Sequence, residues 1–192
     1  AILLAAARRL PWMEERFRKG AWREVQVPLA PLMGKTLGIL GFGNIGKQVA
    51  RRAAAFDMEI LAYDPYPDEA YAAEVGAAFL PLEEVARRAD FLCCHVPLIP
   101  ETQGLIGRDL LSLMKPGSFV VNTSRGGLVD LDAVADALDG GRIRGAALDV
   151  FPEEPPEFAH PIFSMENVVL TPHAAGRGED AIHNTVRHAI TC

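Results

Sequence analysis

Glycines spaced for phosphate binding are the first residues here with a recognisable chemistry. The run G-F-G-N-I-G at residues 41–46 matches G-x-G-x-x-G; it follows an apolar stretch, Thr36–Leu40, and opens a helical pattern, Ile45–Phe56. That strand–turn–helix context is the one in which the pattern binds a dinucleotide, with the pyrophosphate at the helix N-terminus. The first glycine permits a tight turn, the second lets the backbone approach the phosphates, and the third lets the helix pack on the strand. These glycines are Gly41, Gly43 and Gly46. A glycine-rich turn without a ligand is the alternative interpretation.

An acidic residue stands where the adenosine ribose of such a dinucleotide would lie. Asp64 follows Gly46 by 18 residues and comes directly after the apolar stretch Glu59–Tyr63. A carboxylate there can accept hydrogen bonds from the ribose hydroxyls and would repel a 2′-phosphate. The sequence therefore predicts that the cofactor is NAD, in preference to NADP. The alternative interpretation is that Asp64 only begins the turn at Pro65.

Alternating strands and helices must position these residues. Because the predicted strands are continuous apolar runs separated by helices, we expect an α/β fold with a doubly wound parallel sheet, a Rossmann-type domain. The predicted strands are Thr36–Leu40, Glu59–Tyr63, Ala77–Leu80, Phe91–Cys94, Phe119–Asn122, Ala146–Val150 and Val168–Leu170. The predicted helical segments are Ile45–Phe56, Pro67–Val75, Leu82–Arg88, Arg108–Leu111, Leu131–Asp139 and Glu179–Ile190.

The N-terminal segment has a different character. Apolar residues recur every three or four positions over residues 2–19, which predicts a helix with one apolar face, kinked or split at Pro11. We therefore expect three parts: a helix and connection over 1–35, the NAD-binding domain over 36–173, and the start of a returning helix over 174–192. The chain lacks an initial Met and ends inside a helical pattern. These ends lead us to expect a piece of a longer protein.

Composition narrows the partners. The 192 residues carry a net charge of −6 without a long basic run, which argues against a nucleic-acid partner. The sequence contains no run of 18 apolar residues, so we expect no membrane span. The three cysteines form neither a disulfide framework nor a metal motif, so we expect a cytoplasmic protein without a bound metal.

Five segments, in order along the chain, resemble the D-isomer-specific 2-hydroxyacid dehydrogenases. That family includes phosphoglycerate dehydrogenases, glyoxylate and hydroxypyruvate reductases, D-lactate dehydrogenases and formate dehydrogenases. The resemblance covers nearly the whole chain. The segments are Gly38–Gly46, His95–Gly107, Asn122–Asp130, Gly145–Phe151 and Thr171–His173.

The resemblance implies a catalytic set of Arg125, Glu154 and His173. The guanidinium would bind the carboxylate of a 2-oxo acid with two charge-assisted hydrogen bonds. His173 would exchange a proton with the carbonyl oxygen, and Glu154 would orient the imidazole and favour its protonated form. Taken one at a time, Arg125 and Glu154 could be ordinary surface charges, and His173 could cap a helix.

Further positions follow from the same resemblance. It implies that Asp149 meets the nicotinamide amide and that Thr123 lies where the chain passes the nicotinamide. Backbone N–H groups of Asn44 and Ile45 would bind the pyrophosphate. The remaining cofactor-lining positions are Pro97 and Thr102.

The family also implies a second domain, which closes over a small 2-hydroxy or 2-oxo acid and is largely absent from this chain. We expect the chain to bind NAD with little turnover, and to form a homodimer through the helix at 2–19. The competing interpretation of function is a non-catalytic NAD-sensing or corepressor-type protein on the same scaffold.

Overall fold

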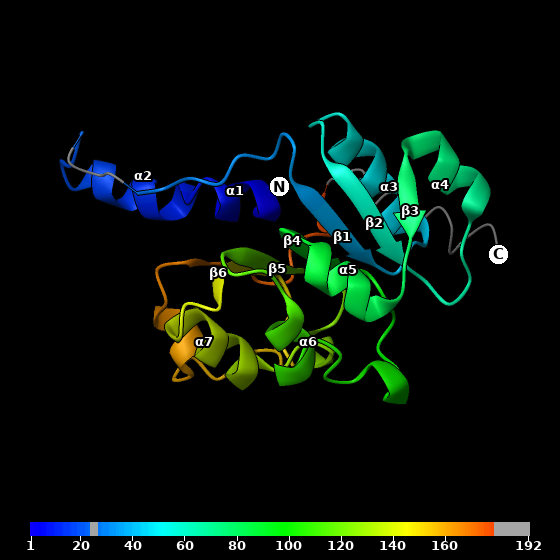
Figure 1. Ribbon diagram of the computed structural model, residues 1–192. Coiled ribbons are helices and arrows are strands. Elements are labelled where there is room, and N and C mark those ends of the chain that lie inside the picture. Colours follow the sequence, from blue (N-terminus) through cyan, green and yellow to red (C-terminus); the bar gives the residue numbers. More distant parts are fainter. Residues whose placement is uncertain (24–26, 179–192) are drawn as a thin grey trace.

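The computed structural model describes residues 1–23 and 27–178, which contain a seven-stranded parallel sheet with strand order β3-β2-β1-β4-β5-β6-β7 (Figure 1). The strands are β1 Thr36–Leu40, β2 Glu59–Tyr63, β3 Ala77–Phe79, β4 Phe91–Cys94, β5 Ser118–Asn122, β6 Ile143–Leu148 and β7 Val168–Leu170. The α-helices are α1 Ile2–Ala7, α2 Leu10–Arg18, α3 Asn44–Ala54, α4 Glu69–Val75, α5 Leu82–Arg88, α6 Arg108–Leu113 and α7 Leu131–Asp139. The 3-10 helices among the described residues are η1 Pro100–Thr102, η2 Gly126–Leu128 and η3 Pro161–Ser164. The predicted α/β fold is confirmed.

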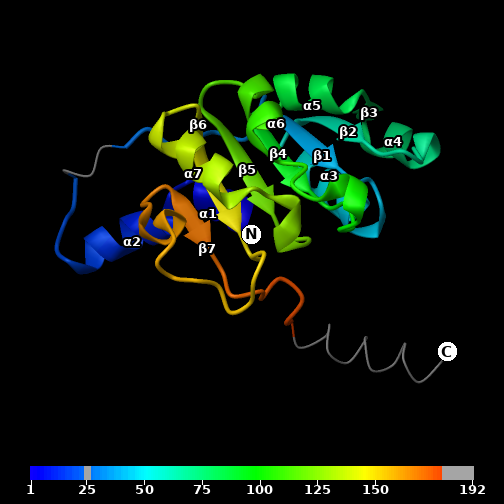
Figure 2. The ribbon, with the colours of Figure 1, turned by 90° about the horizontal axis from the view of Figure 1, so that it is seen from below.

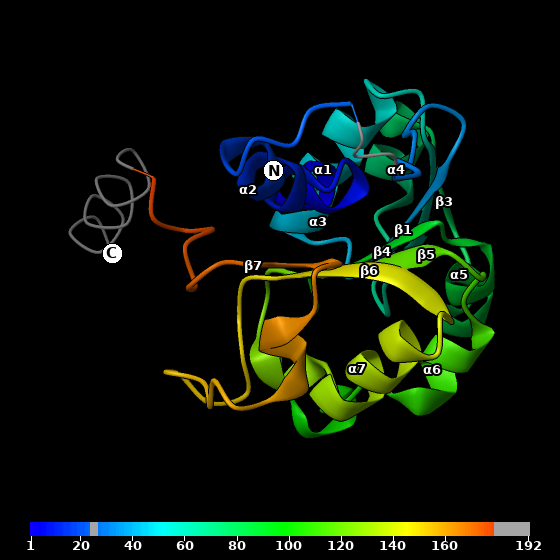
Figure 3. The ribbon, with the colours of Figure 1, turned by 90° about the vertical axis from the view of Figure 1, so that its left-hand side faces the viewer.

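Helices cover both faces of the sheet. Figure 3 shows the sheet nearly edge-on, with α1, α3 and α4 above it and α5, α6 and α7 below. Every residue of β1, β4 and β5 is buried, as expected for strands that are covered on both sides. The upper helices contribute mainly alanines to the core, among them Ala6, Ala50 and Ala72, whereas the lower ones contribute larger residues such as Val85, Leu110 and Val134.

The order of the strands reverses between β1 and β4. The chain runs outward from β1 to β3 on one side, and from β4 to β7 on the other. Directly beyond the ends of these two strands, the His95 N–H donates to the Leu40 carbonyl over 2.7 Å. Ligands of open α/β sheets bind at such a switch point, at the carboxyl ends of the strands. The glycine run at 41–46 begins at this place.

The N-terminal helix is split, as predicted from Pro11. Arg9 has a left-handed backbone (φ 49°) between α1 and α2, and Pro11 lies in the first turn of α2. Ala6 and Ala7 of α1 are buried against the sheet, whereas no residue of α2 is buried. Helix α2 extends away from the sheet (Figures 1 and 2). Trp12 and Arg16 donate hydrogen bonds to the Glu166 carboxylate, which fix the base of this arm.

Several predicted bounds need correction, and that of β6 is the largest. The strand predicted at Ala146–Val150 runs from Ile143 to Leu148. Its start was missed because Arg144 and Gly145 resemble a turn. Glycine is needed at position 145 because the Phe119 ring occupies the space that a side chain would take. The helix predicted at Glu179–Ile190 lies outside the described residues. Within the described part, no helix has the length and apolar character needed to cross a membrane.

Candidate cofactor and catalytic site

The loop after β1 has the shape that a pyrophosphate requires. Gly41 has φ +92°, and a Cβ on it would lie 2.7 Å from the Val96 nitrogen. A Cβ on Gly46 would lie 2.1 Å from the Gly41 carbonyl oxygen, so α3 can approach the strand only with glycine there. A Cβ on Gly43, by contrast, would meet nothing within 4 Å. The loop is therefore closed toward the protein and open at Gly43, where a phosphate would approach. The residues present fit a dinucleotide.

Helix α3 supplies the donors. Gly43 is its N-cap residue, so Asn44 and Ile45 occupy its first turn, where backbone N–H groups have no partner within the helix. Ile45 is exposed, which leaves this end of the helix accessible. Eleven residues of aligned peptide dipoles add a partial positive charge at this end.

Asp64 lies beside the same loop. Its Oδ2 accepts a hydrogen bond from the Phe42 N–H over 2.6 Å, and its Oδ1 accepts one from the Tyr66 N–H over 2.8 Å. Each carboxylate oxygen has two lone pairs, so acceptor capacity remains for ribose hydroxyls. Asp64 thus ties the glycine loop to the end of β2, and it also begins the turn at Pro65, as the alternative interpretation had it. Its contact with a ribose stays a prediction. Sequence reasoning missed the hydrogen bond from the Phe42 N–H, because nothing in the spacing shows it.

The segment that follows β4 is held by its own side chains. The Thr102 hydroxyl donates to the Pro97 carbonyl over 2.7 Å and accepts from the Ile99 N–H over 2.9 Å. Pro97 and Thr102 are thereby brought together at the carboxyl edge of the sheet. His95 is mostly buried, and burial lowers its pKa to about 4, so it is neutral at neutral pH.

Arg125 is presented by a tightly bonded turn at the end of β5. Buried Asn122 donates from Nδ2 to the Arg125 carbonyl over 2.8 Å and accepts from the Ser124 N–H over 3.0 Å. The Ser124 hydroxyl donates to the Val96 carbonyl over 2.7 Å. Thr123 lies inside this turn. The Arg125 side chain is exposed, with one N–H donated to the Ser124 carbonyl, and faces solvent with its other donors.

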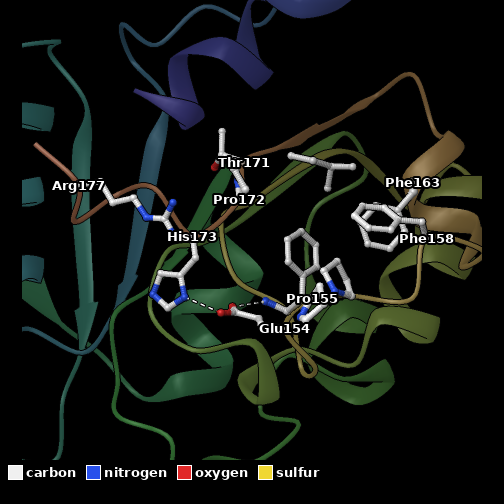
Figure 4. A pocket seen from close by; sticks show the side chains of 11 residues that line it. Glu154, Pro155, Phe158, Phe163, Thr171, Pro172, His173 and Arg177 are labelled. Carbon is white, nitrogen blue, oxygen red and sulfur yellow. Dashed lines mark hydrogen bonds and ion pairs between the residues drawn. The ribbon is translucent and has the colours of Figure 1, made fainter.

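Glu154 and His173 point toward each other (Figure 4). The distance between Glu154 Oε2 and His173 Nδ1 is 2.7 Å, and Oε1 of the same carboxylate accepts from the Phe151 N–H over 3.2 Å. The hydrogen bond from His173, followed by that from Phe151, lowers the pKa of Glu154 below its ordinary value. A carboxylate can only accept, so Nδ1 carries a proton and Nε2 is left to exchange one.

The turn that carries His173 is held by Asp149. His173 has a left-handed backbone (φ 50°), a conformation that costs about 1–3 kcal/mol and persists only when neighbours enforce it. Its N–H donates to the Asp149 carbonyl over 2.7 Å. The Asp149 carboxylate accepts from Thr171 Oγ1 and from the N–H groups of Ala174 and Ala175. Burial raises the pKa of Asp149, but these hydrogen bonds outweigh it and the pKa is lowered.

A cavity of about 610 Å³ adjoins the Glu154–His173 pair. Its wall is mostly aromatic and proline, with Arg177 as a cation on the rim (Figure 4). Phe163 packs against both Phe151 and Phe158, with ring centroids 5.3 and 5.2 Å apart. In the part of the chain that the structure describes, no cluster of His, Cys, Asp or Glu could hold a metal ion.

A parallel sheet with a glycine loop at its switch point defines a dinucleotide-binding domain. The family model described as "D-isomer specific 2-hydroxyacid dehydrogenase, NAD binding domain" matches residues 1–175. The chain belongs to this family, and its cofactor is NAD. The resemblance inferred from the five sequence segments is thus confirmed.

Individual relatives agree. The chain is 44% identical over 181 residues to D-3-phosphoglycerate dehydrogenase of Methanocaldococcus jannaschii, with 94% of this chain and 34% of that protein covered. It is 45% identical over 184 residues to glyoxylate reductase of Korarchaeum cryptofilum, covering 94% and 55%. The holo structure of Rhodotorula graminis D-mandelate dehydrogenase superposes with a TM-score of 0.90 at 33% identity, covering 96% of this chain and 56% of that one. The chain therefore spans only a third to a little over half the length of these relatives.

Proposed function

We propose that this domain serves an NAD-dependent oxidoreductase that interconverts a D-2-hydroxy acid and its 2-oxo acid. The observation that carries the proposal is the 2.7 Å contact between His173 Nδ1 and Glu154 Oε2, because it converts an exposed histidine into an oriented acid–base group. The names of the relatives, a phosphoglycerate dehydrogenase and a glyoxylate reductase, support the same class of reaction.

Three residues divide the work. Arg125, held at the end of β5, binds the substrate carboxylate and polarises the adjacent carbonyl. His173 donates the proton from Nε2 to the carbonyl oxygen during reduction, and takes it back during oxidation. Glu154 keeps the other nitrogen protonated and stabilises the imidazolium. Bound NADH supplies the hydride to the carbonyl carbon.

Cofactor binding is the first test, and it needs only this chain. We expect saturable binding of NADH, followed by nicotinamide fluorescence, and weaker binding of NADPH. Replacing Asp64 by Asn removes a charged acceptor, so the affinity for NADH should fall about tenfold and its advantage over NADPH should shrink. Glu69→Gln makes the same charge change at an exposed site on α4 and should leave both affinities unchanged. Equal affinities for both cofactors in the original chain would refute the role of Asp64.

Turnover is the second test, and it uses the whole protein with a second domain that we propose closes over the substrate. A panel of 2-oxo acids should include a substrate, and His173→Asn should lower kcat by about 10² to 10⁴. An NAD-sensing protein on this scaffold would bind NADH equally well but reduce none of them.

Cys93 and Cys94 are buried free thiols, which fits the proposed cytoplasmic location. We also propose a homodimer.

A further inference from the structure

The loop of Arg125 touches the loop of Glu154 backbone to backbone. A Cβ on Gly126 would lie 1.9 Å from the Phe151 carbonyl carbon, 2.0 Å from its oxygen and 2.4 Å from the Pro152 nitrogen. Such distances are far below any real contact. The φ of Gly126 lies outside the left-handed region that favours glycine. Glycine is therefore required here for space alone.

Phe151 links this contact to the proton-transfer pair. Its N–H donates to Glu154 Oε1, and the other oxygen of that carboxylate binds His173 Nδ1. On the opposite side, Asn122 and Ser124 fix the Arg125 loop to the ends of β5 and β4. The contact at Gly126 thus joins a rigid turn to the residue that orients Glu154.

We propose that Gly126 is a positioning residue: its lack of a side chain lets the Arg125 turn support Phe151, and through Phe151 sets the geometry of Glu154 and His173. The inference rests on the proposed function, since it concerns the same site. It implies that the group that binds the substrate carboxylate and the group that moves the proton are held in register by one backbone contact.

A side chain at position 126 has a definite consequence. Its neighbours are backbone atoms of Phe151 and Pro152, so no rotamer change can make room, and the two loops must separate. Phe151 then carries its N–H away from Glu154. The carboxylate loses one of its two hydrogen-bond donors, and its bond to the imidazole loosens. Gly127 provides a matched control, because a Cβ there would meet only the end of the Leu98 side chain, 2.9 Å away, which can rotate.

The test determines the tautomer of the His173 imidazole by ¹⁵N NMR in the full 192-residue chain, without substrate. In the original chain the neutral ring should carry its proton on Nδ1, the nitrogen bound to Glu154. In the Gly126→Ala chain this tautomer should no longer predominate, and the pKa of the Glu154 carboxyl should be higher. The ¹³C chemical shift of the carboxyl carbon measures that pKa. Gly127→Ala should keep both signals unchanged. A folded Gly126→Ala chain with both signals unchanged would overturn the proposal.

A second variant decides the matter if Gly126→Ala does not fold. Ser124→Ala deletes only the 2.7 Å hydrogen bond to the Val96 carbonyl, so it loosens the Arg125 turn without a clash. We expect a smaller change of both signals in the same direction, and their constancy would overturn the proposal. NADH titration of the same samples keeps the two hypotheses apart. Retained NADH binding with unaltered His173 signals rejects the positioning role alone, whereas absent NADH binding in the original chain rejects the proposed function.

Discussion

At the scale of single residues, the pKa of Glu154 depends on the side chain that it contacts. The hydrogen bond from His173 is the largest influence on its pKa, which is lowered. A lowered pKa in the folded protein means that the ionised form stabilises the fold. This contribution is complete above the ordinary pKa of a glutamate, about 4.3, and is lost as the pH falls through the lowered value. Acid therefore weakens the pair from the side of Glu154.

Replacing His173 by Asn should remove the main cause of the lowered pKa of Glu154. Without the imidazole donor, the pKa of Glu154 should rise toward its ordinary value, which ¹³C NMR of the carboxyl carbon can follow. The stability difference between the original chain and Glu154→Gln, measured by urea unfolding, should shrink as the pH is lowered from 6 to below 4. A difference that stays constant across this range would show that the carboxylate does not ionise differently in the folded state. Asn at position 173 must also leave the turn intact, which the circular dichroism spectrum can check.

At the scale of elements, we expect different glycines of the loop after β1 to serve the stability of the fold and the binding of NADH. Ala at position 46 would place a Cβ 2.1 Å from the Gly41 carbonyl oxygen, so α3 would be pushed from β1. Overpacking of this kind costs about 1–3 kcal/mol, and Tm should fall by about 2–12 °C. Ala at position 43 meets open space and has an ordinary φ of −74°. Its methyl group should hardly change Tm, but should weaken NADH binding about tenfold by occupying the approach of the phosphate. Thermal scans and NADH titrations of both variants check this contrast; equal effects on Tm would contradict it.

The elements also show how far sequence reasoning reaches. Strands β1 and β2 and helix α7 begin and end as predicted, because their apolar runs are bounded by glycine or charged residues. The start of β6 was missed because Arg144 and Gly145 resemble a turn. The glycine is explained by the Phe119 ring on a neighbouring strand and by the Asn167 carbonyl oxygen, which together leave no room for a side chain.

The candidate site divides in the same way. Family resemblance selected Glu154 and His173, and the structure brings them into contact. Resemblance did not show that Asp149 binds the turn of His173, nor that Phe151 donates to Glu154. The Asp149 contact joins segments that meet only after β6 and β7 have paired, so no local pattern records it. The Phe151 contact lies within one loop, three residues apart, but no motif in that loop indicates it. The predicted contacts of Arg125 and Asp149 with substrate and nicotinamide stay predictions.

At the scale of the whole molecule, helix α2 projects from the domain with an apolar surface that the described residues leave exposed. Helix α1 completes the core on one face of the sheet, whereas α2 leaves Leu10 and Phe17 50% and 58% exposed. A concave surface runs along these residues toward Trp22. Apolar side chains gathered on a projecting helix indicate a contact with another protein surface, and a two-fold copy of the same chain is the commonest partner.

The predicted homodimer can be tested by removing that apolar surface while keeping the helix. Gln is a good helix former, so the double change Leu10→Gln and Phe17→Gln should preserve α2 but remove much of the apolar area that a stable interface needs. Sedimentation equilibrium should give twice the mass of one chain for the original protein and a single mass for the double variant. Phe56→Gln changes a similarly exposed aromatic residue, 46% exposed, that follows α3, and should remain dimeric. A monomeric original chain at high concentration, or a double variant that still sediments as a dimer, would place the interface elsewhere.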